Sequence, residues 1–89
     1  MAEREWFKDA TAAAMRGSSR QLTFWTQREA KICLHEYVEW LRRMGITGWT
    51  AIFAMGSQSV RFKSGGSLWF DSHRHAPRPG AAEWFRGGE

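Results

Sequence analysis

The sequence predicts an α+β fold in which two helices pack on one face of a small, mostly antiparallel sheet of three to four strands, in the order α-β-α-β-β-β. Two long segments repeat apolar residues with helical spacing, while several short segments alternate apolar and polar residues. Glycine-rich turns separate the short segments. A chain of 89 residues makes one domain, and its 15% aromatic content can supply a compact core.

The first predicted helix covers residues 3–17. Its apolar positions fall on one helical stripe, and Gly17 is a suitable residue to end it. The stripe consists of Trp6, Phe7, Ala10, Ala13 and Ala14. A short strand is expected at Gln21–Trp25, with Leu22 and Phe24 on one face and Thr23 and Trp25 on the other.

The second helix has the clearest boundaries. Thr26 and Glu29 have the spacing of a capping box, and Gly45 follows Arg42 and Arg43 at the other end. The predicted apolar face consists of Ala30, Cys33, Leu34, Tyr37, Leu41 and Met44, with Trp40 beside it.

Three strands are expected after this helix: residues 49–55, 60–63 and 68–71. The sequence SGGS between the last two indicates a hairpin. Val60, Phe62, Leu68 and Phe70 are expected to face the core. If Phe62 pairs with Phe70, then residues 65–67 form the turn, Arg61 opposes Asp71 and Lys63 opposes Trp69.

The folded domain is predicted to cover residues 1–72. Residues 73–89 contain prolines, glycines and arginines, and we interpret them as a C-terminal tail with one short helical turn at 81–85. Three tail residues are candidate partner contacts: Arg74, Arg78 and Trp84.

Charge and composition restrict the function classes. The net charge is +4, which permits binding to a polyanion, and the single cysteine, Cys33, excludes an internal disulfide. The chain begins without an apolar signal segment and contains no apolar run of the length that spans a membrane. We therefore expect a cytoplasmic protein that does not bind membranes.

The stretch DSHRHAPRPG invites a metal interpretation. Asp71, His73 and His75 alternate, so a continuing strand would place these three zinc-compatible ligands on one face. Zinc binding is therefore a minor alternative. The main interpretation is a solvated strand end, because no fourth ligand is placed nearby and Cys33 belongs to the core face of the second helix. We expect no cofactor.

No sequence motif supports an enzyme. His35, Glu36 and Glu39 lie on or near the solvated side of the second helix, where paired charges are common. Nucleotide-binding, metalloprotease and nucleophile-elbow motifs are missing from the sequence.

Two surfaces are candidate partner sites. Arg61, Lys63 and Trp69 would share the outward face of the hairpin, where an aromatic ring between cations can hold single-stranded nucleic acid or stabilise the sheet. A basic helix face adds Arg28, Lys31, Arg42 and Arg43.

The predicted function is a small, non-enzymatic binding protein. We expect a stoichiometric inhibitor or adaptor that docks on a protein or nucleoprotein complex, in the style of phage anti-defence proteins such as anti-CRISPRs. The alternative is direct nucleic-acid binding through the basic and aromatic sheet face; acidic residues interrupt every basic patch, which favours docking. A homodimer through exposed tryptophans is compatible with both. The α-β-β-β-α order expected for the last two-thirds of the chain is similar to that of double-stranded-RNA-binding domains, but the last helix would be one turn and the lysine cluster that opens that family's last helix is missing.

Overall fold

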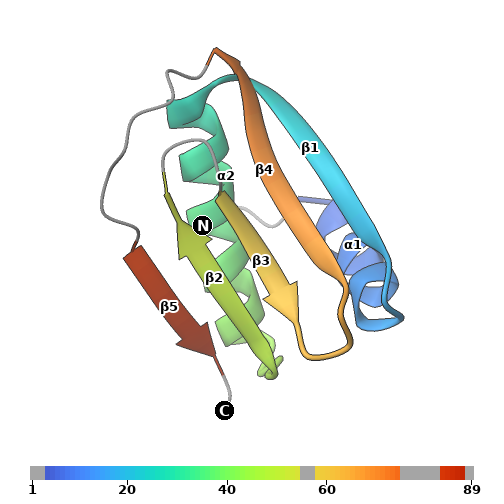
Figure 1. The fold of residues 1–89 in the computed structure, drawn as a ribbon. Coiled ribbons are helices and arrows are strands. Elements are labelled where there is room, and N and C mark those ends of the chain that lie inside the picture. Colours follow the sequence, from blue (N-terminus) through green and yellow to red (C-terminus); the bar gives the residue numbers. More distant parts are fainter. Residues whose placement is uncertain (1–3, 55–57, 75–82, 88–89) are drawn as a thin grey trace.

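The computed structural model describes residues 4–54, 58–74 and 83–87, and for residues 74 and 83–87 it describes only the path of the backbone. The elements are α1 (Trp6–Met15), β1 (Ser19–Thr26), α2 (Gln27–Arg43), β2 (Trp49–Phe53), β3 (Gln58–Phe62), β4 (Ser67–Arg74) and β5 (Glu83–Gly87). The strands form one sheet in the order β1-β4-β3-β2-β5, shown in Figure 1. The predicted α+β class and the order of the first six elements are confirmed.

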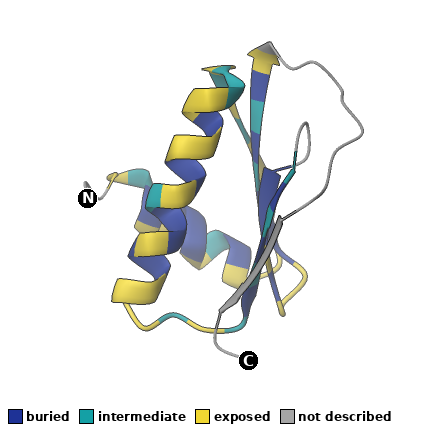
Figure 2. Ribbon diagram, turned by 90° about the vertical axis from the view of Figure 1, so that its left-hand side faces the viewer, coloured by how far each residue is buried: buried dark blue, intermediate teal, exposed yellow. Residues whose placement is uncertain are grey.

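The sheet is mixed because of a single parallel pairing. Strands β2, β3 and β4 form an antiparallel meander, and β5 adds to β2 antiparallel. Strand β1 instead joins the far side of β4 in parallel. Both helices of the described chain lie on one face of the sheet, as Figure 2 shows, so no described helix covers the opposite face.

Helix α1 buries a narrow stripe and is tied to α2. Phe7, Ala10 and Ala14 are buried, and the hydroxyl of Thr11 donates to the Phe7 carbonyl at 2.8 Å. Thr11 also shares a hydrogen bond with the hydroxyl of Tyr37 on α2. Because Thr11 gives its one hydroxyl hydrogen to Phe7, the Tyr37 O–H is the donor in this second bond.

Helix α2 begins and ends close to where the sequence predicts. Thr26 caps it by accepting a hydrogen bond from the Glu29 N–H at 3.2 Å, and Gly45 follows the helix with a φ of 68°. One predicted core residue is wrong: Met44, which directly follows the last helical residue Arg43, is 53% exposed. Val38 and Trp40 are buried instead.

Burial shifts the titration of two groups in this core. It raises the pKa of the Tyr37 hydroxyl to about 12 and the pKa of the Cys33 thiol to about 11. Both side chains have no exposed surface. Each group is therefore neutral in the folded protein well above neutral pH.

The β3–β4 hairpin has the predicted faces but a different register. Val60, Phe62, Leu68 and Phe70 are all buried, as expected. The predicted pairing of Phe62 with Phe70 is wrong, because Phe70 lies opposite Gln58. Gly65, at a φ of 96°, turns the chain early, and the Phe62 N–H already donates to the Gly66 carbonyl at 2.9 Å.

The C-terminal region also differs from the expectation. Residues 83–87 form strand β5 rather than a helical turn at 81–85, and β4 continues to Arg74, beyond the predicted boundary at 72. Strand β2 supplies the backbone partners of β5 in an antiparallel pairing. The last element is therefore not the helix that ends a double-stranded-RNA-binding domain.

Candidate functional site

The candidate site is the helix-free face of the sheet, which we call the open face. Strand alternation and the register define its members, since the neighbouring positions on each strand point to the buried side. Its residues with described side chains are Ser19, Gln21, Thr23, Trp25, Thr50, Ile52, Ser59, Arg61, Ser67, Trp69, Asp71 and His73. The face looks toward the viewer in Figure 1.

Trp69 occupies the middle of the open face. Its ring is half-buried, and its indole N–H donates to the Ser67 hydroxyl at 2.9 Å, which in turn donates to Ser19 at 3.0 Å. The guanidinium of Arg61 lies over the ring, 5.3 Å from its centroid. A hydrogen bond at the indole N–H and a cation over the ring therefore both hold the Trp69 side chain in place.

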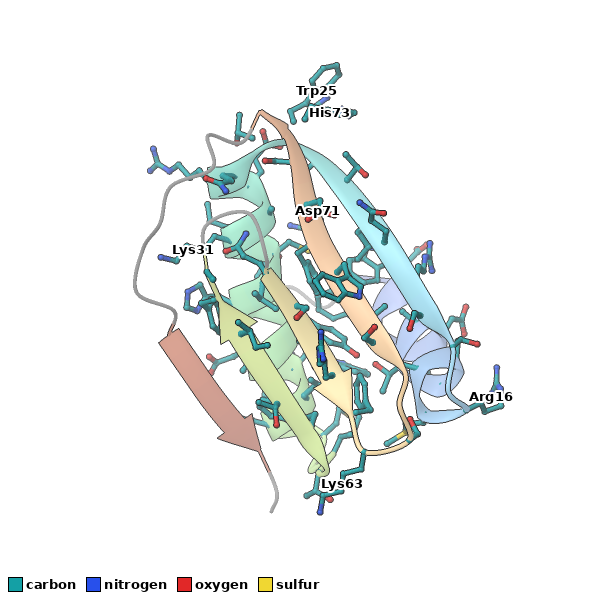
Figure 3. All side chains as sticks on the ribbon, in the orientation of Figure 1. Arg16, Trp25, Lys31, Lys63, Asp71 and His73 are labelled. Carbon is teal, nitrogen blue, oxygen red and sulfur yellow. The ribbon has the colours of Figure 1, made fainter. Side chains whose placement is uncertain are left out.

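The rings of Trp25 and His73 pack together at one end of the open face. Trp25, at the end of β1, is 72% exposed, and its ring centroid is 5.2 Å from that of His73 on β4. Figure 3 shows both side chains together beyond the end of the strands. A tryptophan this exposed buries little apolar area in the monomer and can bury much more against a partner.

Asp71 and His73, two of the three residues in the zinc hypothesis, each contact a neighbouring side chain. Asp71 accepts a hydrogen bond from the side-chain amide of Gln21, and His73 packs on Trp25. His75 lies outside the described residues. Among the side chains that the structure places, no group of three potential ligands lies close enough together to hold a metal ion.

Lys63 does not join the site, contrary to the sequence prediction. It lies in the β3–β4 turn, where its N–H donates to the Gly48 carbonyl at 2.9 Å (Figure 3). Ser59, not Lys63, is opposite Trp69, and Ser67, not Asp71, is opposite Arg61. Because the chain turns early at Gly65, the two predicted pairs, Arg61–Asp71 and Lys63–Trp69, do not form. The cation beside Trp69 is therefore Arg61 and not Lys63.

The basic residues of α2 form a separate surface. Their side chains are exposed on the helix, which packs on the other side of the sheet, as Figure 2 shows. Arg42 lies 5.9 Å from the ring centroid of buried Trp49, and Glu36 pairs with Arg4 at 2.8 Å. The predicted partner-binding residues Arg28, Lys31, Arg42 and Arg43 therefore cannot share one flat contact with Arg61 and Trp69.

The tail contacts are only partly placed. Arg78 lies outside the described residues, and the structure fixes only the backbone of Arg74 and Trp84. By register Trp84 pairs with Ile52, an open-face residue, on strand β5.

Trp25 and Gln21 were not predicted as site residues from the sequence, and His73 was considered there only as a zinc ligand. Alternation in β1 already put Trp25 on the face away from Leu22 and Phe24. The missing information was the parallel pairing with β4, which brings residues about 50 positions apart into contact.

No protein-family model matches this chain, and no curated protein or solved structure is significantly similar to it. Within the described part of the chain, neither helix is long and apolar enough to cross a membrane.

Proposed function

We propose that this chain is a small binding protein that docks on a folded protein partner through the open face and acts by occupying the partner's surface, as an inhibitor or adaptor. The observation that carries the proposal is the presence of Trp25 and the Arg61–Trp69 pair on the same helix-free face. Tryptophan and arginine are the residue types that most often dominate the binding energy of protein interfaces.

The charges of this face support a protein partner over a nucleic acid. Among its described side chains, those that carry a formal charge at pH 7 are Arg61 and Asp71, which offset each other. Direct binding of phosphates usually needs several uninterrupted cations, since counterion release supplies most of the affinity. The net charge of +4 is carried elsewhere, including on the exposed side of α2.

The expected partner surface has an apolar pocket for Trp25 and a carboxylate that meets Arg61. The guanidinium of Arg61 is already positioned by the Trp69 ring, so a carboxylate can bind it with less loss of side-chain freedom. The polar side chains around both tryptophans suit the solvated rim of such an interface.

The test is capture of the partner from host lysate, repeated after nuclease treatment of the lysate, followed by titration of the purified pair. Trp25→Ala and Arg61→Glu are each expected to weaken binding by roughly tenfold to thirtyfold, because tryptophan and arginine side chains often dominate interface energies. Lys31→Glu, on the outer side of α2, is the matched control and should bind as the native chain does. Equal loss in the control would reject the open face, and capture of nucleic acid alone would favour direct nucleic-acid binding.

A further inference from the structure

Strand β1 forms one edge of the sheet, and no other described strand pairs with its outer side. The Ser67 N–H donates to the Ser18 carbonyl at 3.1 Å. This bond determines which residues of β1 direct their backbone N–H and C=O groups toward β4. In this parallel ladder, the N–H and C=O groups of the even-numbered residues of β1 point toward β4. Those of Ser19, Gln21, Thr23 and Trp25 point away from the sheet, and all four residues are exposed.

This edge lacks the usual devices that prevent strand pairing. Proteins protect an edge with prolines, bulges, short strands or several charges. Strand β1 has eight residues, no proline and one charge, Arg20. At the opposite edge, β5 has five residues and includes Glu83, Arg86 and Gly87. The two edges of the same sheet therefore differ, and only β5 has the composition of a protected one.

We propose that β1 pairs antiparallel with β1 of a second copy of this chain, around a two-fold axis perpendicular to the sheet. Such an interface uses the same strand on both copies and closes on itself. The register that uses every outward-pointing backbone group places Leu22 beside Leu22 of the second copy. Gln21 then opposes Thr23, and Ser19 opposes Trp25, of the second copy.

The side chains of β1 fit this register. Arg20 lies across from Phe24 of the second copy on the helix side, where a cation can pack on an aromatic face. The two Arg20 side chains stay apart, so no like charges oppose each other. Leu22 and Phe24 are only half-buried in the monomer and gain apolar contacts.

The dimer would join two open faces into one continuous surface on the same side of the widened sheet. Trp25 would then lie on a central strand of that surface, opposite Ser19 of the second copy, rather than on an edge strand. This inference does not depend on the proposed docking function, because an edge-paired dimer can form whether or not the open face binds a partner.

Sedimentation of the purified full chain across a range of concentrations tests the dimer. The native chain is expected to sediment as a dimer at micromolar concentration. Thr23→Pro removes an outward N–H and no ladder hydrogen bond to β4, so it should weaken the dimer by about tenfold or more while keeping the monomer folded. Thr23→Ala, which keeps the N–H, is the control and should remain dimeric. A native monomer, or a Thr23→Pro chain that dimerises as tightly as the native one, would overturn the proposal.

Cysteine cross-linking tests the register and does not depend on how well the proline variant folds. Leu22→Cys should form an intermolecular disulfide under mild oxidation, because non-hydrogen-bonded antiparallel pairs bring Cα atoms to about 4.5 Å. Thr23→Cys should cross-link far less, since it opposes Gln21 rather than itself. The native Cys33 is fully buried and does not compete. Failure of Leu22→Cys to cross-link in a folded chain would reject this pairing.

Discussion

The guanidinium carbon of Arg61 lies 5.3 Å from the centroid of the Trp69 ring, although the two residues are not opposite each other in the sheet. Arg61 pairs with Ser67 and Trp69 pairs with Ser59, so the contact runs diagonally between β3 and β4. Long side chains can reach such diagonal neighbours on one face of an antiparallel pair. The contact both stabilises the hairpin and fixes the guanidinium on the open face.

The first prediction follows from this contact. Arg61→Ala should lower the free energy of unfolding by about 0.5–1 kcal/mol, the usual range for a cation over an exposed or half-buried ring. Urea unfolding measures the loss. Lys63→Ala, in the neighbouring turn, is the control and should change stability by less. A larger effect for Lys63 than for Arg61 would contradict the assigned partner of Trp69.

The sequence predicted the faces of the hairpin because alternation determines which residues share a side. It could not predict the register, since any pairing whose residue numbers sum to an even value keeps the same faces. The turn decides among these pairings. The sequence SGGS permits several turns. The observed turn contacts helix α1, which is remote in sequence: the Ser64 hydroxyl donates to the Ala14 carbonyl at 2.7 Å.

The candidate site was predictable only in part, for a similar reason. Arg61 and Trp69 are close in sequence, and the hairpin pattern alone placed both on the outward face. Trp25 meets His73 only because β1 lies parallel beside β4, and parallel neighbours are joined through a long crossover. Periodicity within a strand carries no information about which remote strand lies beside it.

The second prediction concerns Gly66, where the hairpin meets α1. A Cβ atom at this position would lie 1.9 Å from the Ala14 carbonyl oxygen and 2.7 Å from the Ser18 oxygen, both backbone atoms. Backbone cannot move aside as a flexible side chain can, so Gly66→Ala should force α1 away from the hairpin. We expect a loss of roughly 3 kcal/mol, the upper range for overpacking.

Gly65→Ala is the matched control in the same turn. A Cβ at Gly65 meets nothing within 4 Å, but its φ of 96° favours glycine. The control should therefore cost only about 1–2 kcal/mol, through backbone strain alone. Thermal unfolding of both variants separates the two effects, and equal losses would show that the close approach of α1 is not the limiting contact.

The third prediction compares two buried tryptophans. Trp49 and Trp40 are 2% and 3% exposed, but only the Trp49 indole N–H has a partner among the described residues, the Ile46 carbonyl at 2.7 Å. Replacement by phenylalanine removes a similar volume at both sites. At Trp49 it also leaves the Ile46 carbonyl without that donor, whereas at Trp40 it removes an unpaired N–H.

Trp49→Phe should therefore destabilise the protein by about 1 kcal/mol more than Trp40→Phe does. Urea unfolding of the two variants under identical conditions provides the comparison. If Trp40→Phe is the more costly change, then the N–H of Trp40 has a partner in solution, such as a buried water.

The fourth prediction is a loss of stability at alkaline pH. Folding raises the pKa of Cys33 from 9.0 to about 11 and that of Tyr37 from 10.0 to about 12, mainly through burial. Below about pH 8 both groups are neutral in the folded and unfolded chains, so neither makes stability depend on pH. Above about pH 8 the unfolded chain loses these protons first, and the free energy of unfolding therefore falls as pH rises.

The loss due to Cys33 should extend from about pH 9 to 11, and the loss due to Tyr37 from about pH 10 to 12, each on the order of 2 kcal/mol in total. Urea unfolding at closely spaced pH values measures the slope. Tyr37→Phe should flatten the profile between pH 10 and 12 and leave the part below pH 10 as it is in the native chain. Thr11 keeps its bond to the Phe7 carbonyl in this variant, so a changed slope reports the lost ionisation rather than a new unpaired hydroxyl. An unaltered profile in Tyr37→Phe would mean that the phenol titrates alike in both states and that its burial does not control alkaline unfolding.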